Sequence, residues 1–507
     1  MYATEILFAT IVALLLLGQT VVRRRGRVLL LLSTAAALTV VTELALGEAR
    51  WQSAPAWLLF AVLALLLLRR AYSHIAFRSL GLAFGALLLA LSVALSLALP
   101  IVTLPAPDGP NVVGSRSFSL LDESRDESYF GAPAERRELY LQVWYPGTID
   151  QTLPQPSVRT LWQELYRGPR DIVTVLFGYL RGIPTHTYQN IPLSTSATAY
   201  PVIVFSHSLG LTAEQNTPLM EHLASHGYVV IGVGHTRMTL RVISSQGQAI
   251  YPSDRMREAF AEGAAIDPQE FDIRAARTNS AEERAELVFE LGERATRMNE
   301  QVAIRVADLR FVLDVIATPT KGPSELATLL ERVDSKRIGL LGMSVGGPTV
   351  IDVCKIDPRC RAGVNLDGAL FGRYQRQPLQ TPFLSLVSAP NKKYDEPLLA
   401  NSTSDYYEVL VEGAGHGDFC DMTFLMPFMK WLGANGPIDP MRAVNIVNAV
   451  SLRFFDAYLR DGPRPRFSTQ ELPELRVTMN ANASTQVAVA FRAGERSDGH
   501  VAMKPSN

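Results

Sequence analysis

The residues best suited to chemistry form a G-x-S-x-G motif. Residues 342–346 read GMSVG, with Ser344 at the centre and Gly342 and Gly346 on either side. An apolar segment, RIGLL, precedes the motif, and GPTVIDVC follows it with helical spacing. A serine on a sharp turn from strand to helix exposes its hydroxyl above the sheet, and the glycines remove side chains that would collide there. The motif therefore predicts Ser344 as the nucleophile of an acyl transfer.

A serine hydroxyl needs a neighbouring base to become a good nucleophile. In strand–turn–helix enzymes of this kind, the chain order is serine, acid, histidine. Two histidines follow Ser344. His416 lies in a loop of small residues, EGAGHGDF, directly after an expected strand, whereas His500 lies in a polar tail. We therefore expect His416 to be the base and His500 to be solvated.

Two aspartates are candidates for the orienting acid. Asp367 ends the apolar run 362–366, whereas Asp395 follows the run 382–387 only after several polar residues. The acid must be held rigidly to fix the imidazole tautomer. We therefore favour Asp367 over Asp395.

An oxyanion hole needs two backbone N–H groups, one from the residue after the nucleophile and one from a loop after an earlier strand. Val345 supplies the first by position. The loop SHSLG at 206–210 follows the apolar run YPVIVF, and we expect Leu209 to supply the second donor. His207 precedes the nucleophile in the chain, so we expect it to shape this loop by hydrogen bonding.

Apolar runs and helical patterns alternate through the part of the chain that carries these residues. Strands are expected at 200–205, 228–233, 337–341, 362–366, 382–387 and 406–411, and helices at 214–225, 299–316, 347–354 and 441–459. This alternation predicts an α/β fold, a mostly parallel sheet with helices on both faces. A hairpin is expected at 115–120 and 138–144, a charged helical insertion at about 253–297, and a peripheral tail at 463–507.

The composition separates an apolar leader from a globular remainder. Of 507 residues, 48% are hydrophobic and 19% charged, which excludes a disordered chain. The 48 basic and 49 acidic residues nearly cancel, so no overall charge attracts nucleic acid. Four apolar runs, at about 3–22, 28–47, 52–68 and 79–101, approach the length that spans a bilayer. We predict a four-helix transmembrane anchor at 1–101, a linker at 102–114 and a catalytic domain at 115–462.

The arginines predict the orientation of this anchor. The first connection, at 23–27, and the third, with Arg69, Arg70 and Arg78, are basic, whereas the second carries Arg50 against Glu48. Basic connections stay in the cytoplasm, so the N-terminus and the catalytic domain are expected outside it, at the inner or plasma membrane. A cleaved signal peptide is an alternative for the first run, but the run lacks a basic start and three more follow. A transporter is disfavoured because no charge lies mid-span.

The three cysteines do not have metal-site spacing, and we expect neither a metal nor a cofactor. Cys354 and Cys360 are close enough in the chain to form a disulfide, or both remain reduced and buried. Cys420 is expected to pack rather than react.

Several segments together resemble the platelet-activating factor acetylhydrolase family of α/β-hydrolases, including bacterial membrane-anchored members. The matching blocks span about 104–460 and are DGPNVVG, ELYLQVWYP, YPVIVFSHSLG, LASHGYVV, RIGLLGMSVGGPTVI, AGVNLDGALF and GAGHGDFCDMTFL. The resemblance implies an α/β-hydrolase fold, Ser344, Asp367 and His416 as a triad, and Leu209 and Val345 as oxyanion donors. The sequence departs from the family at Ser208, where glycine is common, and at Met343, where histidine is usual.

The resemblance implies a membrane-anchored serine ester hydrolase. The expected substrate is a small-molecule or lipid ester with a short acyl chain, including phospholipids with short or oxidised sn-2 chains. The alternatives are a cutinase-like or polyester hydrolase, a peptidase, and a non-catalytic membrane receptor with a vestigial hydrolase fold. The acyl length, the alcohol and the oligomeric state are not predicted.

Overall fold

A computed structural model describes residues 2–21, 26–69, 75–150, 152, 154–265, 268–278, 280–468 and 470–480. His500 and the arginines at 23–25 and 70 lie outside the described residues. The chain divides into two compact units. We call Met1–Leu104, Thr160–Thr185 and Met422–Leu432 the helical unit, and Pro105–Arg159, His186–Asp421 and Gly433–Asn507 the sheet unit.

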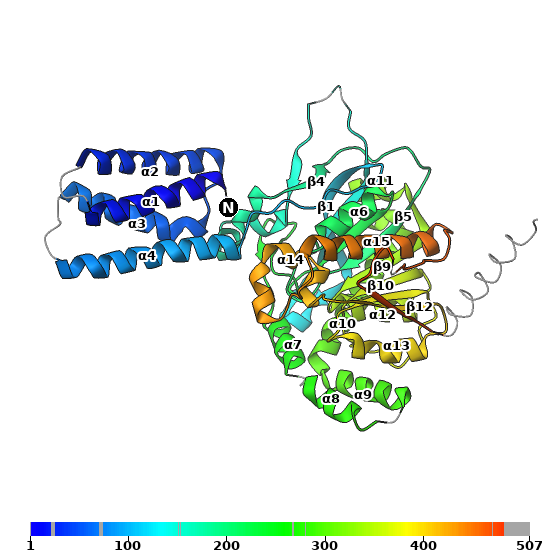
Figure 1. The fold of residues 1–507 in the computed structure, drawn as a ribbon. Helices are drawn as coiled ribbons and strands as arrows, with labels where there is room; N and C mark the ends of the chain where they lie inside the picture. Colours follow the sequence, from blue (N-terminus) through cyan, green and yellow to red (C-terminus); the bar gives the residue numbers. More distant parts are fainter. Residues whose placement is uncertain are drawn as a thin grey trace, which may run out of the picture. The chain divides into compact units, whose positions relative to one another are not determined.

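Four apolar helices, packed side by side, form most of the helical unit (Figure 1): α1 (Ala3–Val21), α2 (Gly26–Leu46), α3 (Ala54–Arg69) and α4 (Ile75–Ala98). Among the described residues, three helices are long and apolar enough to cross a membrane, at Arg27–Leu46, Trp51–Leu68 and Ser79–Ala98, and the apolar stretch Ala3–Gly18 is shorter. Phe8, Val12 and Leu15 are buried between the helices, whereas many leucines and valines point outward. An apolar exterior of this kind suits a lipid environment.

One end of this bundle is held together by a buried ion pair. The Nε atom of Arg50 lies 2.8 Å from Oε1 of Glu5 near the start of α1, and Nη1 donates to the carbonyl of Leu99 just after α4. Arg50 itself precedes η1 (Trp51–Ser53) in the connection between α2 and α3. The start of α1, the α2–α3 connection and the end of α4 therefore share one end of the bundle.

The sheet formed by the described residues has eleven strands in the order β13-β12-β11-β10-β9-β5-β6-β2-β1-β4-β3. Neighbouring strands from β12 to β6 run parallel, while β2 pairs antiparallel with β6 and with β1. The strands are β1 (Val112–Glu127), β2 (Ala132–Gly147), β3 (Val158–Thr160), β4 (Pro184–Gln189), β5 (Tyr200–Ser206), β6 (Val229–His235), β9 (Val333–Met343), β10 (Cys360–Leu366), β11 (Phe383–Val387), β12 (Tyr406–Val411) and β13 (Leu475–Met479). The predicted hairpin and mostly parallel sheet are confirmed.

Helices cover both faces of the sheet, as the alternating pattern predicts (Figure 1). On one face lie α10 (Thr296–Ala317), α12 (Gly346–Ile356) and α13 (Glu396–Asn401). On the other lie α6 (Thr217–Ser225) and α15 (Pro440–Leu459). The charged stretch at 253–297 contains α7 (Asp254–Ala264), α8 (Pro268–Ala275) and α9 (Ala281–Arg294). The central strand β5 is buried along its whole length, because both of its faces are covered.

The structure adds features that the sequence analysis did not specify. The tail, expected to be peripheral, contributes β13, which pairs antiparallel with β12 at the edge of the sheet. Residues 481–507 of this tail lie outside the described residues. Cys354 and Cys360 form a disulfide, and Cys420 is buried as a free thiol.

Candidate active site

Ser344 lies on the turn between β9 and α12. Its backbone has a φ of 56°, in the left-handed region that a side-chain-bearing residue rarely adopts. A Cβ atom on Gly342 would lie 2.0 Å from the carbonyl oxygen of Gly346, and one on Gly346 would lie 2.0 Å from that of Ser206. Both positions therefore require glycine, and the tight turn raises the serine hydroxyl above the carboxyl edge of the sheet.

The structure brings Ser344, His416 and Asp367 into one hydrogen-bonded chain. The Oγ atom of Ser344 lies 3.0 Å from Nε2 of His416, and Nδ1 of His416 lies 2.7 Å from Oδ2 of Asp367. The three residues follow β9, β12 and β10, whose carboxyl ends meet at the same edge of the parallel sheet. A carboxylate only accepts hydrogen bonds, so Nδ1 carries the proton and Nε2 is left to accept from the serine hydroxyl.

Two polar residues that the sequence analysis missed hold the Asp367 carboxylate. The backbone N–H of Ser388 donates to Oδ1 at 2.6 Å, and its hydroxyl donates to Oδ2 at 3.0 Å. The amide of Asn391 donates to Oδ2 at 2.8 Å. Asp367 is 1% exposed, so these donors replace the water that a surface carboxylate would have. Their position directly after β11, the neighbour of β10, is the signal that could have identified them.

The alternative acid, Asp395, has a different environment. It is fully buried and accepts a hydrogen bond of 2.7 Å from the hydroxyl of Tyr406. Burial, together with the nearby Glu408, raises the pKa of Asp395 to about 8. Asp395 is thus a largely protonated interior acid at neutral pH, whereas Asp367 contacts the imidazole.

The loop after β5 lies against the nucleophile turn. The close contact of Gly346 with Ser206 joins the two segments. The N–H groups of Ser208 and Gly210 donate to Oε1 of Gln215 and to the carbonyl of Met238. Within the described part of the chain, the N–H groups of Leu209 and Val345 have no acceptor. Val345 adjoins Ser344 at the start of α12, where the helix dipole favours negative charge, and Leu209 belongs to the loop that contacts the Ser344 turn.

Buried groups support this loop from behind. Nδ1 of His207 lies 2.6 Å from the carbonyl of Ser208, and Nε2 accepts from the backbone N–H of His235. Burial holds the pKa of His207 well below its usual range, so the ring is neutral. The fully buried Arg305 donates to the carbonyl of His207. The sequence analysis missed Arg305, because an arginine within a helical pattern carries no sign that it is buried.

The two departures from the family pattern touch each other. The hydroxyl of Ser208 lies 3.0 Å from the sulfur of Met343, and it also contacts Oε1 of Gln215. The two departures therefore contact each other between the loop at 206–210 and the turn at Ser344, and neither contact uses the backbone N–H of Leu209 or Val345.

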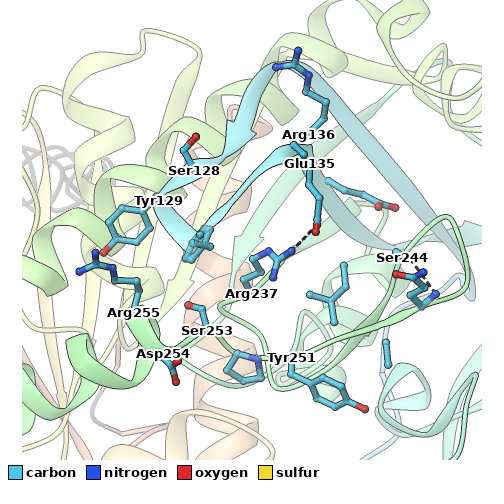
Figure 2. Close-up of a pocket in the computed structure, with 18 of the residues that line it drawn as sticks. Ser128, Tyr129, Glu135, Arg136, Arg237, Ser244, Tyr251, Ser253, Asp254 and Arg255 are labelled. Carbon is cyan, nitrogen blue, oxygen red and sulfur yellow. Dashed lines mark hydrogen bonds and ion pairs between the residues drawn. The ribbon is translucent and has the colours of Figure 1, made fainter.

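A separate cavity of about 1140 Å³ lies beyond the end of β6. The end of the β1–β2 hairpin, Arg237, the loop at 244–253 and the start of α7 form its walls, and Ser344, Asp367 and His416 are not among the lining residues. Figure 2 shows Arg237 reaching Glu135, to which it is ion-paired, and Tyr129 beside Arg255. Acidic and basic side chains are both numerous in this lining, so the cavity has a polar, charge-balanced wall.

The fold and its relatives define a class: the chain is a serine ester hydrolase with the α/β-hydrolase fold. A ferulic acid esterase from Streptomyces cinnamoneus has a similar structure, with a TM-score of 0.56 and 26% identity over 75% of this chain and 99% of that one. Residues 100–462 match the family model described as platelet-activating factor acetylhydrolase, isoform II, and the chain belongs to that family.

Animal members of the family are similar over most of their length. The platelet-activating factor acetylhydrolase of Gallus gallus is 25% identical over 387 residues, which cover 70% of this chain and 83% of that protein. The enzyme of Cavia porcellus is 25% identical over 382 residues, which cover 70% and 78%. These findings identify the chain as an enzyme, so the alternative of a non-catalytic membrane receptor is wrong.

Proposed function

We propose that Ser344, His416 and Asp367 are the catalytic triad of a membrane-anchored carboxylic-ester hydrolase. The observation that carries the proposal is a pair of hydrogen bonds: Nδ1–H of His416 donates to Asp367 at 2.7 Å, and the hydroxyl of Ser344 donates to Nε2 of His416 at 3.0 Å. The imidazole side chain is 44% exposed, so a substrate can reach it.

The proposed reaction proceeds through an acyl-enzyme. His416 takes the proton of Ser344 while Oγ attacks the ester carbonyl carbon, and the carbonyl oxygen becomes an oxyanion. The tetrahedral intermediate then collapses, and His416 gives the proton to the departing alcohol. Water, deprotonated by His416, attacks the acyl-enzyme in the same manner and releases the carboxylic acid and free Ser344. Neither a metal nor a cofactor takes part in this scheme.

The N–H groups of Leu209 and Val345 would stabilise the oxyanion. Their lack of an acceptor among the described residues supports this role. Donors that point at developing charge are preorganised, and losing one typically costs about 3 kcal/mol of transition-state stabilisation. Because both are backbone groups, the contact between Ser208 and Met343 affects their position rather than their chemistry.

The helical unit would anchor the enzyme in the membrane. Four antiparallel spans put the N-terminus, the α2–α3 connection and the chain after α4 on the same side of the membrane. The contacts of Arg50 agree with this, because they join the α2–α3 connection to the start of α1 and to the end of α4. The opposite helix ends flank the arginine-rich connections of the sequence, which favours the cytoplasm for that side. The sheet unit would then work outside the cytoplasm, where the disulfide of Cys354 and Cys360 is stable.

Exposed apolar side chains outside the four helices support a lipid substrate. Trp431 is 87% exposed, Leu432 is 71% exposed and Ile172 is 68% exposed, and all belong to the helical unit. Trp51, which begins η1, donates to the carbonyl of Leu176 in the segment that carries Ile172. Tryptophan is enriched where a bilayer meets water. These segments would rest on the membrane surface, where short-acyl lipid esters are available.

The test uses the full-length protein in detergent. We expect hydrolysis of p-nitrophenyl acetate and butyrate, covalent labelling by a fluorophosphonate probe, and loss of both in Ser344→Ala. A panel of phospholipids with short, oxidised and long sn-2 chains, together with methyl ferulate and a polyester oligomer, identifies the substrate class. An intact Ser344→Ala variant with full activity would refute the triad, and preference for long sn-2 chains or polyester would refute the substrate.

A further inference from the structure

A second cluster of reactive side chains lies outside the active site, at the C-terminal end of α6. His222 lies in the last turn of α6 and His226, four positions later, directly follows the helix, so the two rings lie together, with centroids 4.5 Å apart. Nδ1 of His222 lies 3.0 Å from Oδ1 of Asp108, and Nε2 of His226 lies 3.6 Å from the same oxygen. One nitrogen from each ring and a carboxylate oxygen all lie within 4.8 Å of one another.

The segment that carries Asp108 is fastened to the end of α6. The N–H of Gly109 donates to Oγ of Ser225, and both the backbone and the side-chain amide of Asn111 donate to the Ser225 carbonyl. A Cβ atom on Gly109 would lie 2.4 Å from the Ser225 backbone, so this close contact needs glycine. Asp108 is consequently held over the histidines, although its own side chain is 76% exposed.

Hydrogen bonding orients the second histidine as a ligand. Nδ1 of His226 lies 2.9 Å from the carbonyl of His222, so it carries the proton and donates. Nε2 is then left without a proton 3.6 Å from the Asp108 carboxylate, an arrangement that is repulsive unless a proton or a metal cation lies between them. A ring nitrogen whose partner N–H is held by a backbone carbonyl is the usual arrangement of a metal-binding histidine.

The surroundings of the first histidine also favour a cation. His222 is 7% exposed, and its Nδ1 atom lies 3.0 Å from the Asp108 carboxylate, whose negative charge attracts a cation. The cluster lies in the last turn of α6, where the helix dipole favours positive charge. A cation held there would neutralise Asp108.

We propose that Asp108, His222 and His226 bind a divalent transition-metal ion, with zinc the best match. In tetrahedral zinc sites with bonds of about 2.0–2.1 Å, neighbouring ligand atoms are about 3.3 Å apart. The observed separations of 3.0 and 3.6 Å lie on either side of that value. Two imidazoles and one carboxylate suit zinc, whereas calcium and magnesium take oxygen ligands. The exposed side of Asp108 leaves the fourth position to water.

The proposed metal is structural, and the proposal is independent of the esterase function. The metal ion would connect residues 108–111, near the start of the sheet unit, to the C-terminal end of α6. The plain alternative is a hydrogen bond from His222 to Asp108 with no metal.

The experiment uses the full-length protein in detergent, purified with a tag that lacks histidine and stripped with a chelator. Titration with zinc chloride in a calorimeter should give about one zinc per chain and raise the Tm, and cobalt should give the visible spectrum of tetrahedral Co²⁺. Asp108→Asn and His226→Gln should each weaken zinc binding about tenfold or more.

Matched controls make each outcome decisive. His186→Gln changes a histidine that contacts Glu221 instead, and it should bind zinc as the wild type does. Each variant must keep the metal-free Tm and the esterase activity of the parent, which separates lost binding from misfolding. A folded wild type that binds no zinc, or a double variant of Asp108 and His226 that binds it unchanged, would overturn the proposal.

Discussion

The helical unit and the sheet unit place their polar and apolar side chains in opposite ways. In the helical unit, leucines and valines face outward, and the buried charges include the pair of Glu5 and Arg50 at one end. In the sheet unit, apolar side chains fill the interior and polar groups converge at the carboxyl edge of the strands, where Asp367 and His416 meet. The two units thus differ in whether apolar side chains line the exterior or the interior, and substitutions in the two units should have separable effects.

The largest effect is expected from Asp367, the proposed orienting acid in the sheet unit. Asp367→Asn should lower kcat about 10⁴-fold, because an amide at that position favours the wrong imidazole tautomer. Asp395→Asn should leave kcat within a few-fold, because Asp395 contacts Tyr406 and not His416. The measurement is kcat on p-nitrophenyl butyrate with both variants in the full-length protein. A loss of kcat in Asp395→Asn as large as that in Asp367→Asn would contradict the assignment of Asp367 as the orienting acid.

Sequence reasoning selected Ser344, Asp367 and His416, which the structure brings together, because local pattern and chain order carry that information. The strand–turn–helix around Ser344 is visible in about a dozen consecutive residues, and the order of Asp367 and His416 follows from it. Sequence reasoning did not find Arg305, because the role of this residue depends on which face of α10 packs against the loop at 206–210. Sequence reasoning also did not assign the segments 160–185 and 422–432 to the helical unit, because contacts between residues far apart in the chain place them there.

The next largest effect should be in the helical unit. Arg50→Met leaves Glu5 as an uncompensated buried charge, and breaking such a pair costs about 3–5 kcal/mol of unfolding free energy. The double variant Glu5→Gln, Arg50→Met should recover part of this loss. Unfolding of the helical unit in mixed detergent micelles provides the measurement, with kcat on a soluble ester as the control. A fall in kcat while the helices stay folded would contradict the separation of the two units.

A smaller effect is expected at the exposed aromatic side chain of the helical unit. Trp431→Ser should reduce kcat/KM for a short-acyl phospholipid in vesicles about tenfold, because burying a large apolar side chain contributes about 1.5–3 kcal/mol. Hydrolysis of a soluble p-nitrophenyl ester should not change. Phe260→Ser, at a side chain of the sheet unit that is 62% exposed, is the matched control. An equal fall in kcat/KM on vesicles in Trp431→Ser and Phe260→Ser would show that Trp431 makes no special contact with the lipid surface.

The last expected effect, and the smallest on catalysis, is a pH dependence of the stability of the sheet unit. The pKa of Asp395 is raised to about 8 by burial, whereas in the unfolded chain it is close to the ordinary value of about 3.9. Between these values the unfolded chain releases the proton and the folded chain retains it, so stability is full below about pH 4 and falls as the pH rises toward 8. The slope from one group is at most about 1.4 kcal/mol per pH unit.

The variant Asp395→Asn removes this proton while keeping an oxygen that can accept from Tyr406. Its unfolding free energy, measured by denaturant titration at several values between pH 5 and 8, should fall less steeply than that of the wild type. Unfolding of the helical unit should show no difference between the two proteins. If the unfolding free energies of the wild type and the variant ran parallel across this pH range, Asp395 would be ionised in the folded protein. A buried ionised Asp395 would need a neighbouring cation, which the contact with Tyr406 does not provide.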